Sequence, residues 1–212
     1  MTRSIAAQLD ANAAAAGDAV WLTSPDTGAR VTWSEAAAWS RDIACQLDAM
    51  GLDDGAPVAV AAQNSIWSTL CFTGITAGGY LATPLNLVAG ARVMSYVIAH
   101  SGARVILCTD DQRQLIDEAL ANIDHAVTII RLDPDHGPEW PEGPAPAATP
   151  RTTPDACSAG LLMYTSGTTG NPKGVILSHA NLMAAGMNVV DGHGVGRDDT
   201  GMCVLPIYHI NG

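Results

Sequence analysis

Residues 164–174 could bind the phosphates of a nucleotide. The run reads Tyr-Thr-Ser-Gly-Thr-Thr-Gly-Asn-Pro-Lys-Gly, so glycines and hydroxyl side chains fill most of it and Lys173 comes near its end. Glycines let the backbone approach an anion closely, while hydroxyl groups, amides and a lysine can bind phosphate oxygens. The apolar runs at 159–164 and 175–177 predict a strand on each side of the loop. We interpret the run as a triphosphate-binding loop.

The run differs from the phosphate loop in which Gly-Lys is followed by Ser or Thr and then by a helix. Here Pro172 precedes Lys173, Gly174 follows it, and the next residues are apolar and extended in pattern. This excludes a P-loop phosphotransferase. A plain surface turn between two hairpin strands is the alternative. The whole eleven-residue pattern, with both apolar flanks, favours the binding loop over that turn.

Two motifs resemble those of the adenylate-forming superfamily, which includes acyl-CoA synthetases, aryl-CoA ligases, luciferases and peptide-synthetase adenylation domains. Residues 165–174 are similar to the signature phosphate loop of that family. Residues 205–212, Leu-Pro-Ile-Tyr-His-Ile-Asn-Gly, resemble its next motif in the form usual for acyl- and aryl-CoA ligases. Looser similarity at residues 31–35 and 82–86 extends the resemblance along nearly the whole chain.

The resemblance implies a role for each matching residue. Those expected to hold the ATP triphosphate and to help pyrophosphate leave are Thr165, Ser166, Gly167, Thr168, Thr169, Gly170 and Lys173. Thr165 is also expected to lie close to a Mg²⁺ ion, and Lys173 to act in catalysis. His209 is expected to border the acyl pocket and to orient the substrate carboxylate. It need not act as a general base, because a carboxylic acid is already ionised near pH 7.

These roles imply an AMP-forming acyl-CoA ligase. Such an enzyme activates a carboxylic acid with ATP to an acyl-adenylate and then forms a CoA thioester, so ATP, Mg²⁺ and coenzyme A are the implied cofactors and co-substrate. Fatty, aryl and small carboxylic acids all remain open as substrates, and a carrier protein remains open as acceptor. The alternative function is that of a degenerate, non-enzymatic remnant that binds nucleotide or serves as an interaction module.

Parts of the family pattern are missing from this sequence. They are the Tyr-Gly-x-Thr-Glu segment whose glutamate helps to hold Mg²⁺, the aspartate that binds the ribose, and the small C-terminal domain with its catalytic lysine. We therefore expect residues 1–212 to form an incomplete, truncated N-terminal AMP-binding domain that is inactive or incomplete alone. Its expected partners are the carboxylic acid substrate and a complementing C-terminal fragment or a second copy.

Composition and charge exclude other classes of protein. The chain has 10 basic and 21 acidic residues and a net charge of -11, which argues against nucleic acid or an anionic membrane as partner. No charged residue lies between Asp54 and Arg92, but polar residues and glycines interrupt every window of about 20 residues that a spanning helix would need. We expect no membrane span. The N-terminus lacks the apolar core of a signal peptide, which predicts a cytoplasmic location.

The remaining candidate ligands carry weaker claims. No cysteine spacing predicts a zinc site, and most of the five cysteines lie in apolar runs, which predicts buried free thiols. Asp198 and Asp199 form an adjacent carboxylate pair that could serve a metal or an acid/base role, but a solvated turn is favoured. His179 directly follows the second strand of the loop region and is expected to cap or pack against a helix.

Alternating helical and extended patterns predict an α/β protein with a largely parallel sheet flanked by helices. Helices are expected at residues 4–16, 34–50, 65–77, 93–100 and 111–122. Strands are expected at residues 57–62, 80–83, 104–108 and 126–131, after a hairpin at 20–33. Thr32 and Glu35 fit a capping box at a helix start. Residues 133–154 hold seven of the twelve prolines and are expected to form a surface linker within the domain.

Overall fold

The computed structural model describes residues 3–165, 171–196 and 198–209. Its helices are α1 (Ile5–Ala16), α2 (Trp33–Ala49), α3 (Ile66–Ala77), α4 (Ala91–Ser101), α5 (Arg113–Leu120) and α6 (His179–His193), with a short 3₁₀ helix η1 (Asp110–Gln112). A small hairpin is formed by β1 (Val20–Thr23) and β2 (Arg30–Thr32). The strands of the main sheet are β3 (Pro57–Ala61), β4 (Leu81–Pro84), β5 (Val105–Cys108), β6 (Thr128–Asp133), β7 (Gly137–Pro138), β8 (Ala159–Thr165) and β9 (Lys173–Ser178).

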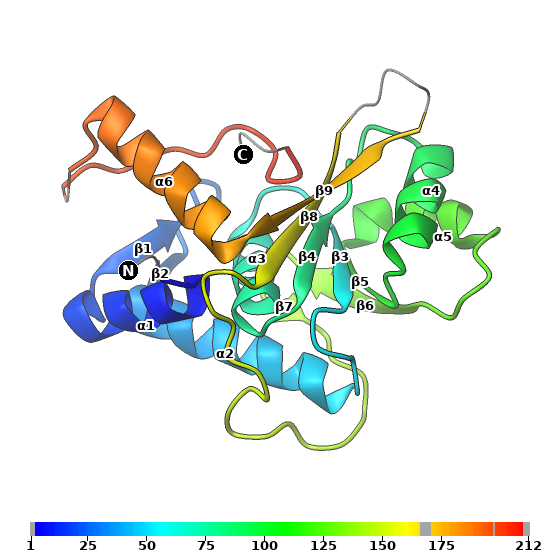
Figure 1. Cartoon of the computed structure of the whole chain (residues 1–212), viewed down its shortest axis with the longest axis horizontal. Coiled ribbons are helices and arrows are strands. Elements are labelled where there is room, and N and C mark those ends of the chain that lie inside the picture. Colours follow the sequence, from blue (N-terminus) through cyan, green and yellow to red (C-terminus); the bar gives the residue numbers. More distant parts are fainter. Residues whose placement is uncertain (1–2, 166–170, 197, 210–212) are drawn as a thin grey trace.

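The main sheet lies between two groups of helices (Figure 1). Among the described residues its strand order is β7-β6-β5-β3-β4-β8-β9. The five inner strands run parallel, whereas β7 and β9 pair antiparallel at the two edges. The predicted α/β class with a largely parallel sheet is therefore confirmed.

The two faces of the sheet have separate cores. Val58 and Val60 of β3 face a cluster that includes side chains of α2 and α3, while Ala59 and Ala61 face a second cluster with α4 and α5. Successive residues of a strand point to opposite faces, so a strand buried on both sides is apolar at every position. This explains the charge-free sequence around β3, α3 and β4. No helix among the described residues is long and apolar enough to cross a membrane.

Side-chain hydrogen bonds cap the N-termini of several helices. The Thr32 hydroxyl accepts the N–H of Glu35, and the Glu35 carboxylate accepts the N–H of Thr32, which confirms the predicted capping box of α2. Ser65 and Ser178 form similar boxes at α3 and α6, which the sequence interpretation missed. Caps of this kind stabilise a helix by about 1 kcal/mol each. They fix where the chain leaves β3 and β9.

The first half of the predicted linker contains a strand that was not foreseen. The Asp133 carboxylate accepts the N–H groups of Asp135 and His136 at 2.9 and 3.0 Å, which turns the chain back so that β7 pairs with β6. Gly137 has a φ of +96°, and a Cβ there would lie 2.8 Å from the Trp67 indole. Only glycine fits this position, because both the backbone and the packing exclude a side chain.

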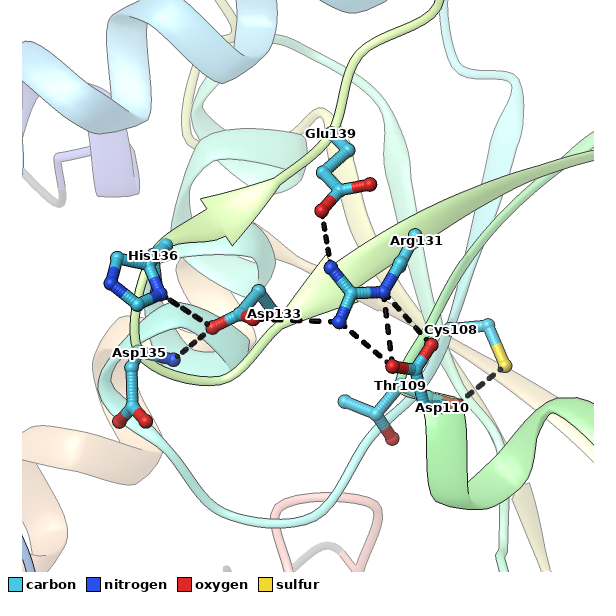
Figure 2. A network of polar contacts seen from close by, with 8 residues as sticks. All are labelled: Cys108, Thr109, Asp110, Arg131, Asp133, Asp135, His136 and Glu139. Carbon is cyan, nitrogen blue, oxygen red and sulfur yellow. Dashed lines mark hydrogen bonds and ion pairs between the residues drawn. The ribbon is translucent and has the colours of Figure 1, made fainter.

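A cluster around Arg131 joins this turn to the rest of the sheet edge (Figure 2). The guanidinium donates from Nε and Nη2 to the Asp110 carboxylate at 2.8–3.0 Å, and its other nitrogen contacts Glu139. Hydrogen bonding from Arg131 lowers the pKa of Asp110, and the two carboxylates raise the pKa of Arg131. The groups are exposed and screened by water, so the cluster mainly orients η1 and β7.

A second arginine holds the later part of the linker. The backbone N–H of Arg151 donates to Asp48 at 2.6 Å, and its guanidinium donates to Asp54 and to the carbonyl of Leu52, both at 2.7 Å. The Tyr80 hydroxyl donates to the other oxygen of Asp48 at 2.5 Å. The proline-rich segment is thus attached to the end of α2 before it enters β8.

Three of the five expected buried thiols are buried. These are Cys45, Cys71 and Cys108, which agrees with the expectation for most of the cysteines, whereas Cys157 and Cys203 are exposed. Burial raises the pKa of the Cys108 thiol to about 12. No group of three or more His, Cys, Asp or Glu side chains in the described part of the chain could hold a metal ion.

His179 packs into the interior as the first residue of α6, as expected. It is fully buried, and its Nδ1 accepts the backbone N–H of Ile5 at 3.1 Å. The neutral ring therefore carries its proton on Nε2, which has no hydrogen-bond partner among the described residues. Burial lowers the pKa of His179. The side chain links α6 to the start of α1 across 174 positions of sequence.

We expect the free energy of unfolding to fall as the pH drops below about 6.5, the ordinary pKa of histidine. The unfolded chain takes up a proton there that buried His179 resists, so protonation favours unfolding. Urea titrations between pH 7.5 and 5 measure this, with the His179→Gln variant expected to lose much of the slope. His193→Gln, at the exposed end of α6, is the control. Equal slopes in both variants would contradict the assignment.

We expect Gly74→Ala to lower the free energy of unfolding by roughly 1–3 kcal/mol, because the new Cβ would lie 2.8 Å from that of Ile43 where α3 crosses α2. Gly186→Ala in α6 is the matched control. Nothing lies within 4 Å of a Cβ at Gly186, so helix propensity alone should raise stability by about 0.5–1 kcal/mol. Chemical denaturation of both variants compares the two. A stabilising Gly74→Ala would show that the helices can move apart freely.

Candidate nucleotide site at the carboxyl edge of the sheet

The predicted strand, loop and strand around residues 164–174 form an antiparallel hairpin. Thr165 at the end of β8 is the register partner of Lys173 at the start of β9, so the two candidate residues face each other across the base of the loop. No helix follows Lys173, which agrees with the exclusion of a P-loop. Five predicted phosphate ligands lie outside the described residues, and their roles stay predictions: Ser166, Gly167, Thr168, Thr169 and Gly170.

Tyr164 fixes the loop end of β8 to α4. Its hydroxyl lies 2.8 Å from Nδ1 of His100, and the two rings meet edge to face with centroids 5.7 Å apart. Tyr96 stacks on the same histidine. Burial raises the pKa of the Tyr164 hydroxyl to about 12, so it stays protonated at neutral pH. Tyr164 therefore supports the hairpin and does not titrate with the site.

Gly174 lets the hairpin pack closely beside the lysine. A Cβ at this position would lie 3.1 Å from Leu162 and 3.4 Å from the Tyr164 ring, which is tighter than ordinary contact. The glycine after Lys173 thus has a packing reason in addition to any contact with a ligand. Lys173 is also the only lysine in the chain, and its side chain is exposed. It is the single ammonium side chain able to meet a phosphate.

The second motif lies along the same edge of the sheet. Asn64, three positions after the end of β3, donates from Nδ2 to the carbonyl of Leu205 at 2.8 Å and accepts the N–H of Ile207 at 2.9 Å. His209 is exposed, and its backbone N–H donates to the carbonyl of Pro206. The described part of the motif is therefore a turn attached to the sheet through Asn64.

Parallel pairing brings the two motifs to one edge. β3 pairs parallel with β4, and β4 pairs parallel with β8, so their carboxyl ends lie together. Figure 1 shows the β8–β9 hairpin and the C-terminal segment on the same upper side of the sheet. Crevices outside the carboxyl ends of parallel strands are the usual place for ligands in α/β proteins. Thr165 and Lys173 are direct partners, and His209 joins them at this edge.

A cavity of about 410 Å³ opens further along this edge, beyond β3, β5 and β6. Its lining residues are Gln63, Asn64, Ser65, Thr109, Asp110, Asp111, Leu132 and Pro134. A hydrogen bond from Thr109 lowers the pKa of Asp111, so the cavity carries negative charge at neutral pH. Carboxylates repel phosphates, so the cavity does not suit a triphosphate.

The described residues offer only part of a magnesium site. Thr165 is exposed at the end of β8 and offers one neutral hydroxyl oxygen. Mg²⁺ keeps several waters and binds substrate phosphates together with one or two protein oxygens, so a single hydroxyl fits that chemistry. Asp198 and Asp199 do not add to the site. Asp199 accepts the N–H of Gly196 in a local exposed turn.

Comparison with known proteins assigns this chain to a family. The sequence model of the family described as "AMP-binding enzyme" matches residues 9–212. The chain belongs to the AMP-binding enzyme family. This family assignment covers both motifs and the sheet that carries them.

Its relatives include several CoA ligases. The chain is 36% identical to sulfoacetate–CoA ligase of Cupriavidus necator over 98% of its own length and 41% of the relative. It is 30% identical to 4-coumarate–CoA ligase 2 of Oryza sativa and 29% to the long-chain-fatty-acid–CoA ligase FadD13 of Mycobacterium tuberculosis, covering 39% and 37% of them. The chain thus spans about two fifths of the length of these curated relatives.

Solved structures show the same fold. The N-terminal domain of FACL13 from Mycobacterium tuberculosis superposes with a TM-score of 0.84 at 26% identity, covering 98% of this chain and 52% of that one. ATP-bound MatB from Rhodopseudomonas palustris gives 0.82 at 26% identity, covering 97% and 41%. The sheet and its flanking helices are therefore those of the N-terminal domains of adenylate-forming ligases.

Sequence reasoning missed the residues that hold the two motifs. Asn64 and His100 were not among the candidates, although both contact residues of the motif regions. A signal existed for Asn64, since Gln-Asn-Ser directly follows an apolar strand at the edge where ligands bind. No signal in the sequence pairs His100 with Tyr164, which is 64 positions away.

We expect Tyr164→Phe to lower the free energy of unfolding by about 1 kcal/mol, because it leaves His100 without the hydroxyl contact of 2.8 Å. Urea denaturation at pH 7.5 measures the change. Tyr96→Phe is the matched control, since it removes a hydroxyl from a ring that only stacks on His100. Equal losses in the two variants would mean that the Tyr164 contact contributes nothing specific.

Proposed function

We propose that this chain supplies the triphosphate-binding part of an AMP-forming carboxylic acid–CoA ligase. The observation that carries the proposal is the register pair of Thr165 and Lys173, which closes the phosphate-loop motif at the carboxyl edge of the sheet. The CoA-ligase relatives and the amino-acid sequence of residues 205–209 support coenzyme A as the acceptor. The acid belongs to the range represented by those relatives, which act on sulfoacetate, coumarate and long-chain fatty acids.

In the proposed reaction, a carboxylate oxygen of the acid bonds to the α-phosphorus of ATP while the bond to the bridging oxygen of pyrophosphate breaks. Lys173 and Thr165 hold the phosphates, with the loop residues 166–170 donating to their oxygens, so that the charge developing on pyrophosphate is stabilised. His209 orients the carboxylate. Bound Mg²⁺ would neutralise phosphate charge beside Thr165.

We further propose that residues 1–212 form the first part of the N-terminal AMP-binding domain, with residues 133–154 as a linker inside it, in a cytoplasmic enzyme. Its remaining parts would come from further polypeptide or from a second copy. The β9 edge supports this, because Val175 and Ile176 of that strand are 42% and 61% exposed. An open edge strand with apolar side chains invites pairing with another strand.

Where a second copy or further polypeptide completes the site, we expect ATP–pyrophosphate exchange that depends on a carboxylic acid, tested with sulfoacetate, coumarate and a long-chain fatty acid. Lys173→Ala and Thr165→Ala should lower the rate about 100-fold or more, because each removes a contact to charge that develops in the reaction. Arg113→Ala, which removes a distant exposed positive charge on α5, is the control.

A second readout separates binding from turnover. Lys173 carries the only side-chain amine, so ATP with Mg²⁺ should protect it from an amine-modifying reagent. Protection without exchange would support a triphosphate site that needs the rest of the ligase, or a non-enzymatic nucleotide-binding module. If a folded chain shows no protection of Lys173 and no exchange, the proposal is refuted.

A further inference from the structure

We propose that Asn64 is a positioning residue for the acyl-site motif, and this inference rests on the proposed function. Its carboxamide holds the peptide groups on either side of Pro206, three residues before His209. Asn64 belongs to neither recognised motif. It would act through the backbone of residues 205–207 and touch neither the nucleotide nor the acid.

The Asn64 carboxamide donates one hydrogen bond to the backbone of the motif and accepts one from it, as a neighbouring strand would. Asn64 Nδ2 donates to the Leu205 carbonyl at 2.8 Å, and Asn64 Oδ1 accepts the Ile207 N–H at 2.9 Å. One side-chain amide thus binds one backbone acceptor and one backbone donor of the motif. The two hydrogen bonds together fix the position and the orientation of residues 205–207 at the sheet edge. A weaker third contact runs from Nδ2 to the carbonyl of Cys203 at 3.4 Å.

The residue that makes these contacts is itself held firmly. Asn64 lies between the end of β3, the central strand of the sheet, and Ser65, the N-cap of α3. Ser65 accepts the N–H of Ser68 at 3.0 Å, and the Ser68 hydroxyl accepts the N–H of Ser65 at 2.8 Å. Functional groups borne on rigid elements are placed more accurately than groups on loops.

The motif, by contrast, has little support of its own. Residues 199–205 form no helix or strand and are exposed, with Met202 79% and Val204 75% accessible. Among the described residues, every hydrogen bond from residues 203–207 to the sheet region involves Asn64. Asn64 therefore provides the described hydrogen bonds that place residues 205–207, just before His209, relative to the sheet.

The first test measures the attachment directly. In Asn64→Ala, the amide proton of Ile207 should exchange with solvent roughly tenfold faster, because its acceptor is lost. Asn64→Asp keeps an acceptor for Ile207 but faces the Leu205 carbonyl with a second acceptor, so intermediate protection is expected. Gln63→Ala, which removes the neighbouring carboxamide, should leave the Ile207 rate unchanged. Unchanged exchange in Asn64→Ala would overturn the proposal whatever the activity of the chain.

The second test asks what the attachment does. In pyrophosphate exchange, Asn64→Ala should raise the KM for the acid about tenfold while the KM for ATP changes less than twofold, since the phosphate hairpin is held separately through Tyr164. Equal changes in both KM values would indicate a merely structural role and count against positioning. If the wild-type chain shows no exchange, protection of Lys173 by ATP decides the proposed function, and the Ile207 measurement alone decides the inference.

Discussion

Parallel pairing of β3, β4 and β8 is the constraint on which the site depends. The pairing puts the carboxyl ends of these strands at one edge, where the chain after β3 carries Asn64 and the end of β8 carries Thr165. Apolar burial on both faces holds the pairing in place, with α2 and α3 on one side and α4 and α5 on the other. Two motifs about 40 residues apart in sequence reach the same edge because of this packing.

Positive and negative side chains lie at different places along the same edge of the sheet. The hairpin brings the only lysine to the end of β8 and β9, while Asp110 and Asp111 line the cavity near β5 and β6. Lys173 attracts an anion and the two carboxylates repel one, which favours the hairpin end of the edge for the proposed triphosphate site. An acidic protein can therefore bind a polyanion, because the local arrangement outweighs the net charge of -11.

Local signals made much of the fold predictable. The Thr32–Glu35 box, the apolar strands and the phosphate-loop motif are each contained in a few consecutive residues. What could not be predicted depends on residues far apart in sequence. The β7 turn needs the Trp67 indole above Gly137, His179 accepts a hydrogen bond from the N–H of Ile5, and Asn64 holds a segment 141 positions away. The motifs of the candidate site could thus be located from the sequence, whereas the contacts that orient them could not.

The two edges of the sheet differ in a way that limits assembly. β7 has two residues, of which Pro138 lacks a backbone N–H, so it offers little to a further strand. β9 has six residues, among them the exposed side chains of Val175 and Ile176. If two copies of this chain met through β9, the contact would have two-fold symmetry and would close at the dimer.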